Sequence, residues 1–160
     1  MSGLTTRITG WNDIFVKIAS SLQSAFLLVI RVYWGWQFAQ TGWGKLHSLP
    51  HVVEFFSSLG IPAPGVTAVF VSVFELVAGI LLALGFVSRI TALGIVTDMT
   101  VAYITADREA LASAFSSDAT KFINASPFIF WAVALVVLFF GPGKYALDTL
   151  LAKKFRKTSG

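Results

Sequence analysis

The sequence predicts an all-α protein, a four-helix transmembrane bundle in which residues 1–160 form a single domain. The first observation behind this prediction is composition: 56% of the residues are hydrophobic and only 12% are charged, whereas a soluble domain carries about 25% charged residues. The second is that the apolar residues gather in four segments, and a helix of about 20 residues crosses the hydrocarbon of a bilayer. The third is that none of these segments alternates apolar and polar residues, as the strands of a membrane barrel do.

Turn residues set the limits of the four predicted spans, which cover residues of about 22–40, 65–86, 90–106 and 125–141. "GIPAPG" precedes the second span. Only "VSR" separates the second span from the third, so these two form a tight antiparallel hairpin. Ser126 and Pro127 are typical of the first turn of a helix and open the fourth span, which "GPGK" ends.

Two shorter helices are expected beside the spans. An N-terminal interfacial helix precedes the first span, because one face of that segment is apolar and the other is polar. The apolar face consists of Trp11, Ile14, Phe15, Ile18 and Leu22. In the first outer loop, "HVVEFFSSLG" predicts a short amphipathic helix that lies at the membrane surface.

The distribution of basic residues predicts the orientation. If both termini lie on one side of the membrane, that side holds eight of the 12 Lys and Arg residues and the other side holds three. The positive-inside rule therefore predicts a multi-pass protein of the cell inner membrane whose two termini, with a basic tail at 145–160, are cytoplasmic. The net charge of +4 is thus a topology signal, and no nucleic-acid partner is expected.

The residues that bind common cofactors are scarce. The sequence has no cysteine, which excludes disulfides, thiolate metal sites and covalent haem attachment. His47, His51 and Glu54 have a helical spacing that suits a metal, but Pro50 interrupts the turn between them. No metal, flavin or haem site is therefore expected, and any redox role needs a bound cofactor or a partner that supplies electrons.

Three ionisable residues, Arg31, Glu75 and Asp98, interrupt the apolar spans near their predicted centres. Each charge costs about 2.5–3.5 kcal/mol at the centre of a membrane helix, so we expect all three to face inward at one depth and to form an ion network. Full ionisation leaves a charge of −1, so one carboxyl holds a proton, or Lys45 or a ligand supplies the balance. These three are the candidate catalytic residues, through proton exchange with a bound ligand. The alternative is a static network that holds three helices together.

Aromatic residues near these charges predict a wall for a flat ligand. Trp34 and Phe38 share a helical face with Arg31 and Lys45, and Phe74 lies in the second span. Because small-molecule pockets are usually lined by aromatic side chains with a few polar groups, the candidate ligand-binding residues are Trp34, Phe38, Lys45 and Phe74.

Over about residues 25–150, several motifs together resemble the DoxX family of small four-span membrane proteins. They are "RVYWG" at 31–35, "GWGKL" at 42–46, "LGIPAP" at 59–64, "FELVAGILLALGFVSRITALG" at 74–94 and "GPGKYALD" at 141–148. The positions that match the family pattern are Arg31, Lys45, Glu75, Gly79, Arg89 and Asp148. The resemblance implies a membrane subunit of an oxidoreductase assembly, since its relatives include the membrane part of thiosulfate:quinone oxidoreductases.

The leading functional hypothesis that follows from this resemblance is a membrane subunit associated with quinone-linked redox chemistry, without a self-contained catalytic motif. A quinone or similar isoprenoid would lie near the Arg31, Glu75 and Asp98 cluster. A protein partner in a membrane complex would supply the electrons, and the lipid bilayer is the other expected partner. Two alternatives remain: a non-catalytic structural subunit of a larger membrane complex, and a lipid- or isoprenoid-binding protein without redox chemistry.

Overall fold

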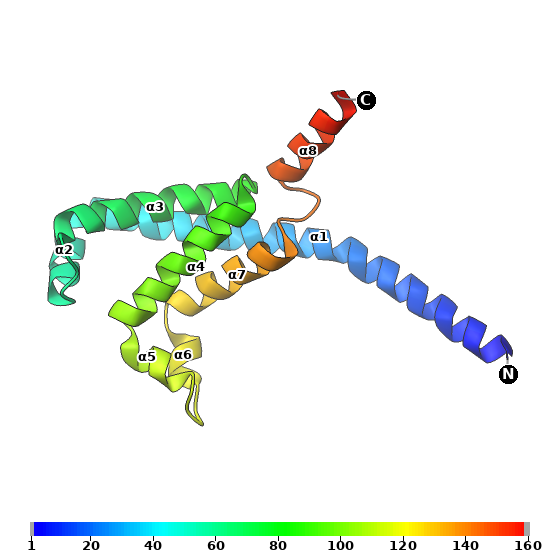
Figure 1. The fold of residues 1–160 in the computed structure, drawn as a ribbon, viewed down its shortest axis with the longest axis horizontal. Helices are drawn as coiled ribbons and strands as arrows, with labels where there is room; N and C mark the ends of the chain where they lie inside the picture. The colour runs from blue at the N-terminus through cyan, green and yellow to red at the C-terminus, as the bar shows by residue number, and fades with distance from the viewer. Residues whose placement is uncertain (1, 159–160) are drawn as a thin grey trace.

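The computed structural model describes the backbone of residues 2–158 and the side chains of residues 13–156. All regular structure within these residues is helical (Figure 1), which confirms the predicted all-α class. The helices are α1 (Ser2–His47), α2 (Leu49–Ser58), α3 (Pro64–Leu84), α4 (Ser88–Thr105), α5 (Arg108–Ser113), α6 (Thr120–Asn124), α7 (Pro127–Phe140) and α8 (Leu147–Thr158).

The predicted limits of the last three spans lie within two residues of α3, α4 and α7. Proline and glycine fix the ends of α3 and α7. Pro64 and Pro127 stand in the first turns of α3 and α7, and Gly85 ends α3 in the left-handed conformation with a φ of 69°. The amphipathic segment predicted in the first outer loop is the helix α2.

The N-terminal segment is helical as predicted, but it does not form a helix apart from the first span, because α1 is one continuous helix of 46 residues. Residues 11–22 contain no proline or glycine, so nothing in this segment ends the helix before the first predicted span. Trp11 lies outside the residues whose side chains are described, and Ile14, Phe15, Ile18 and Leu22 are exposed. The start of α1 projects past the other helices (Figure 1).

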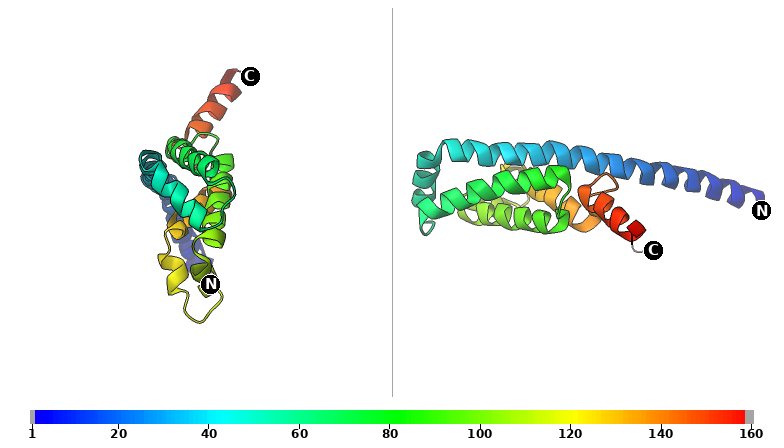
Figure 2. Two further views of the ribbon diagram at one scale, coloured as in Figure 1. Left: turned by 90° about the vertical axis from the view of Figure 1, so that its left-hand side faces the viewer. Right: turned by 90° about the horizontal axis from the view of Figure 1, so that it is seen from above.

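Four helices pack side by side around the core. The most extensive contacts pair α1 with α3 and α4 with α7, and smaller ones join α3 to α4 and α1 to α7 (Figure 2). Glycines let α1 and α3 meet backbone to backbone, since Gly35 faces Ala83 and Gly79 faces Ala39. The buried apolar core comprises Phe38, Ala78, Leu82, Ala92, Ile95, Met99, Ala134 and Val137.

The outer faces of these helices are apolar. Large exposed hydrophobic side chains include Phe26 and Trp36 on α1, Val66 and Phe70 on α3, and Ile90 on α4. Contiguous patches of this kind are rare on soluble proteins. By length and composition, Asp13–His47 and α3 can each cross a membrane, and α7 is an apolar helix of 14 residues. These features are typical of a membrane protein.

The molecule has two distinct ends. The start of α1 and the helix α8 lie at one end, here called the terminal end (Figure 1). Helix α2 and the short helices α5 and α6 lie toward the opposite end, here called the distal end (Figure 2). The connections α1–α2–α3 and α4–α5–α6–α7 are made there, so both enclose the distal half of the core.

Candidate functional site

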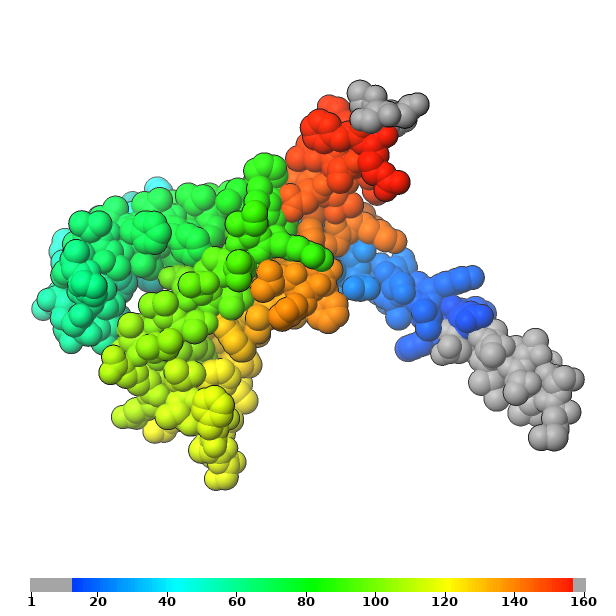
Figure 3. Space-filling view, viewed as in Figure 1, coloured from blue at the N-terminus to red at the C-terminus, as the bar shows by residue number. Residues whose placement is uncertain are grey.

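A cavity of about 530 Å³ lies among α1, α2, α3, α4 and the start of α7, in the distal half of the molecule. Most of its lining is apolar, including Phe38, Phe56, Met99 and Phe130. Its polar lining comprises Thr41, Lys45, Thr67, Glu75, Asp98, Thr105, Asp107 and Ser126. The notch between α2 and the end of α4 is visible in Figure 3. A concave, mainly apolar site with a few polar groups is the usual form of a small-molecule site.

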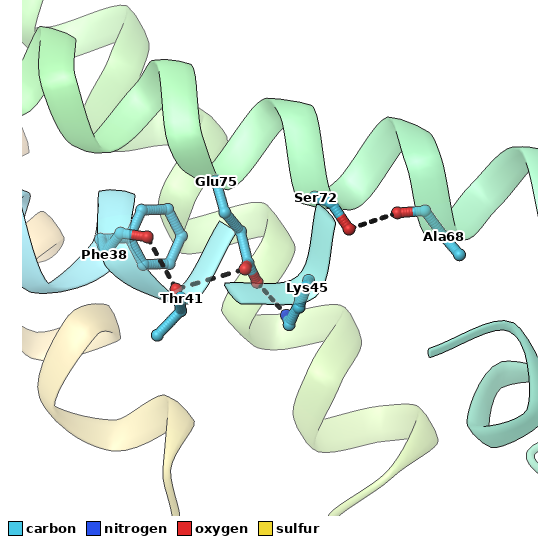
Figure 4. Close-up of polar contacts among 6 residues, drawn as sticks. All are labelled: Phe38, Thr41, Lys45, Ala68, Ser72 and Glu75. Carbon is cyan, nitrogen blue, oxygen red and sulfur yellow. Dashed lines mark hydrogen bonds and ion pairs between the residues drawn. The ribbon is translucent and has the colours of Figure 1, made fainter. Parts of the chain in front are cut away.

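The Glu75 carboxylate is held by an ion pair inside this cavity (Figure 4). Lys45 Nζ lies 2.5 Å from Glu75 Oε1, and the Glu75 side chain is only 3% exposed while that of Lys45 is 34% exposed. The Thr41 hydroxyl lies 3.3 Å from Glu75 Oε2, but it makes its shorter bond, 2.7 Å, to the Phe38 carbonyl. Lys45 is thus the group that neutralises Glu75, and it still reaches the open space of the cavity.

Asp98 enters the same cavity from α4. Its Oδ2 atom is buried and has no hydrogen-bond partner among the described side chains. Burial of a polar atom without a partner is costly, and native structures almost always satisfy such atoms. The sequence therefore predicted correctly that Glu75 and Asp98 face one interior space, and Asp98 retains an unused bonding position there.

Arg31 does not join these carboxylates. It is 1% exposed, and it donates hydrogen bonds to the Pro142 carbonyl at 2.8 Å and the Tyr145 carbonyl at 3.2 Å. The close packing of α1 on α3 sets this register, because it brings Arg31 beside Gly85. Ten residues of helix separate Gly85 from Glu75, or about 15 Å at 1.5 Å per residue. The predicted common depth of the three charges is therefore wrong for Arg31, which belongs to the terminal end.

The predicted aromatic wall is only partly present. Phe38, 1% exposed, lines the cavity. Trp34 packs edge-on against Phe130, with ring centroids 5.8 Å apart, but does not line the cavity. Phe74 points toward α4, where its ring lies against Gly94.

Thr41 and Phe130 are among the cavity residues that sequence reasoning did not select. Thr41 lies four residues before Lys45 and three after Phe38, so the helical period alone would have placed it on their face. Phe130 carries no such signal, since α7 is apolar on all sides. Its position depends on how α7 packs against α1 and α4.

Comparison with known proteins decides the family. The DoxX family model matches residues 26–108, which is more than half of the 160 residues. The chain belongs to the DoxX family. It is also similar to the inner membrane protein YqjF of Escherichia coli K12, with 25% identity over 134 residues that cover 84% of this chain and 98% of YqjF. No solved structure matches it.

The match of this DoxX protein to the family model includes the four ionisable side chains that line the cavity, Lys45, Glu75, Asp98 and Asp107. It also includes Arg31, but not the loop between α7 and α8 to which Arg31 donates. The ionisable residues of the cavity therefore lie within the matched region, whereas Ser126, Pro127 and Phe130, which also line it, lie outside.

At the terminal end, the DoxX chain closes the α3–α4 turn with Asp148. Its two carboxylate oxygens accept hydrogen bonds from the Val87 amide at 2.7 Å and the Ser88 amide at 2.8 Å, and its own amide donates to the Gly85 carbonyl at 3.0 Å. Val87 has a φ of 48°, an unusual value for a β-branched residue. Asp148 thus caps α4 across 60 residues of sequence.

This cap gives a prediction for stability against pH. Burial raises the pKa of Asp148, but hydrogen bonds from Ser88 and Val87 and the charge of Arg31 outweigh it and hold the pKa below its ordinary 3.8. A carboxyl with a lowered folded pKa stabilises the fold above its unfolded pKa and loses that effect as the pH falls through the folded pKa. Asp148→Asn should therefore cost about 1 kcal/mol at neutral pH, the usual value of a helix cap.

The measurement is thermal unfolding of both proteins in lipid nanodiscs between pH 7 and pH 2.5. The difference between them should shrink below about pH 3.8, where the unfolded carboxyl takes up a proton. Glu54→Gln, an exposed carboxyl on α2, is the matched control and should leave the unfolding temperature unchanged. A difference for Asp148→Asn that stays constant over this range would show that the cap does not depend on the charge.

Proposed function

We propose that this DoxX protein is a four-span protein of the cell inner membrane that binds a lipid-soluble quinone in the cavity between α1, α3 and α4. The observation that carries the proposal is the unpartnered, buried Oδ2 of Asp98, which faces an apolar cavity also reached by the Lys45 ammonium. In this proposal α1, α3, α4 and α7 all cross the bilayer with both termini cytoplasmic. The relative YqjF is an inner membrane protein, which supports the proposed cellular location.

The cavity suits a ring-sized ligand in volume and chemistry. Its 530 Å³ falls within the roughly 300–1,000 Å³ typical of small-molecule sites. Phe38 and Phe130, whose ring centroids lie 5.0 Å apart, form one apolar wall. A quinone needs an apolar slot for its ring and polar partners for its two carbonyl oxygens, and Lys45 and Asp98 are polar partners of this kind.

Proton exchange is the chemistry that we assign to these side chains. Reduction of a quinone to a quinol consumes two electrons and two protons. Asp98 as a neutral acid delivers one proton to a ring oxygen, and the Lys45 ammonium delivers the other; water at the distal end restores both. Glu75, 2.5 Å from Lys45 Nζ, holds the Lys45 side chain in position at the cavity. A redox protein partner supplies the electrons, since the sequence contains no metal, flavin or haem motif.

The first test is mass spectrometry of the protein purified gently from its native membrane, read for extracted isoprenoids and for accompanying proteins. Quinone in a near-equal molar amount supports the proposal. A fixed protein partner without any quinone contradicts it and favours a structural subunit. An isoprenoid or lipid without a quinone ring favours a binding protein instead.

Replacing Asp98 by asparagine tests the proton transfer. Asp98→Asn keeps the shape and polarity of the side chain but removes the proton, so quinone-linked turnover in the native assembly should fall about 100-fold or more, as for a lost general acid. Binding of the quinone should change far less. Glu109→Gln, at an exposed carboxyl that does not line the cavity, is the control and should keep its turnover. Full turnover by Asp98→Asn would remove the proton role from the proposal.

A further inference from the structure

We propose that the cavity opens sideways into the bilayer between α2 and α4, and that its ligand is an amphiphile whose isoprenoid chain stays in the lipid while its head group lies between Lys45 and Asp98. The assignment of the head group rests on the proposed function. The position of the opening does not, because it follows from the exposure of the cavity wall alone.

On the α4 side, the opening is bordered by Val101, an outward-facing side chain that also lines the cavity. Ile90, Leu93, Val101 and Ile104 are 72%, 54%, 50% and 50% exposed, and their spacing puts them on one face of α4. Val101 lines the cavity as well, whereas Ile104 does not. The lipid-facing stripe of α4 therefore runs into the cavity wall at Val101.

The α2 side repeats this arrangement. Phe55 is 47% exposed and lines the cavity, while its neighbour Phe56 is buried. Val52 and Phe56 pack against Ala68, so α2 is attached to α3 and not to α4. Among the described side chains, no hydrogen bond or ion pair joins α2 to α4. The gap between the two helices is thus edged by apolar side chains that nothing polar ties together.

The polarity of the cavity defines the class of ligand that fits. Two of the carboxylates that line it are Glu75, which is buried, and Asp98, whose Oδ2 atom is buried, whereas Phe55 and Val101, which line it as well, are about half exposed. A molecule with a polar head and a long apolar chain matches this gradient, because the chain remains in hydrocarbon and only the head group leaves it. A water-soluble ligand without a chain would gain nothing from an apolar edge.

A probe that needs no ligand tests the opening itself. The chain has no cysteine, so one introduced cysteine carries a nitroxide at a single site. At Val71→Cys, inside the cavity, the nitroxide in nanodiscs should collide more often with lipid-dissolved oxygen than with a water-soluble nickel chelate. Ile104→Cys gives the lipid reference and the exposed Asp118→Cys the water reference. Preferential collision with the nickel chelate at position 71 would overturn the sideways opening.

Matched tryptophan variants test the path of the chain. Val101→Trp narrows the opening, while Ile104→Trp adds the same bulk to an equally exposed position outside the cavity. For a benzoquinone with a long isoprenoid chain, Val101→Trp should slow association about tenfold, a typical effect on an association rate, and Ile104→Trp should not. The same ring without a chain should bind more weakly than the long-chain quinone and be less affected by Val101→Trp.

Equal slowing by both tryptophans, or equally tight binding of the ring without its chain, would overturn the assignment of an amphiphile. If the wild-type protein binds neither quinone while the nitroxide at position 71 still meets oxygen, the proposed function fails and the sideways opening stands. These outcomes separate the two proposals.

Discussion

Replacing Gly79 by alanine should destabilise the protein by about 3 kcal/mol, at the upper end of the usual range for overpacking. A methyl group at Gly79 would meet the backbone nitrogen of Ala39 and the carbonyl oxygen of Gly35, far inside van der Waals contact. Backbone atoms cannot turn aside as a side chain can. Helices α1 and α3 would have to separate, and with them the Lys45–Glu75 pair, which joins the same two helices.

Gly44→Ala is the matched control on α1. No atom lies within 4 Å of the methyl group that this change adds, so we expect a small gain, up to about 1 kcal/mol, from the better helix propensity of alanine. Reversible unfolding of both variants in mixed detergent micelles measures the difference. Equal stability of the two would mean that α1 and α3 do not touch as closely as the structure has them.

Lys45→Met should have the second large effect, a loss of about 3 kcal/mol, as found when one partner of a buried ion pair is removed. The change leaves the Glu75 carboxylate, 3% exposed, without its cation. Replacing both residues, in Lys45→Met with Glu75→Leu, should recover most of the loss, because no buried charge is then left unpaired. The double variant should still fail to bind the proposed quinone, since it lacks the ammonium.

The exposed pair of Lys121 and Glu109 provides the control. These side chains are 70% and 90% exposed and lie 3.5 Å apart, so Lys121→Met should cost less than about 1 kcal/mol. Unfolding titrations of the three variants supply the comparison. If Lys45→Met is no less stable than Lys121→Met, Glu75 is already neutral in the folded protein and the ion pair is not the form that matters.

The sequence allowed the ends of α3 and α7 to be predicted because proline and glycine act locally. The inward-facing positions of Glu75 and Asp98 could also be predicted, because a charge exposed to lipid costs too much free energy for most other positions. The predicted depth of Arg31 was wrong for a reason that is not local in the sequence. Its depth was counted from the start of an apolar segment, whereas the true depth depends on the register of α1 against α3, which glycine contacts between two helices decide.

The prediction that Phe74 contacts the ligand was wrong because of the direction in which its side chain points. Phe74 points about 100° away from Glu75 around α3, toward α4, where its ring lies against Gly94. The continuity of α1 was missed because an amphipathic segment before a span does not by itself predict a break between the segment and the span. A break needs a residue that ends the helix, and residues 11–22 have none.

The uneven packing of the long helices has a consequence for finding the ligand. The cavity lies where the α1–α3 pair meets the α4–α7 pair. A ligand in it would therefore contact both pairs of helices and hold them together. Any molecule that binds only the folded form raises the melting temperature in proportion to the logarithm of its concentration, and a 100-fold excess over its dissociation constant adds about 2.7 kcal/mol. Fractions of a crude lipid extract, scored by melting temperature alone, would therefore reveal the natural ligand before its chemistry is known.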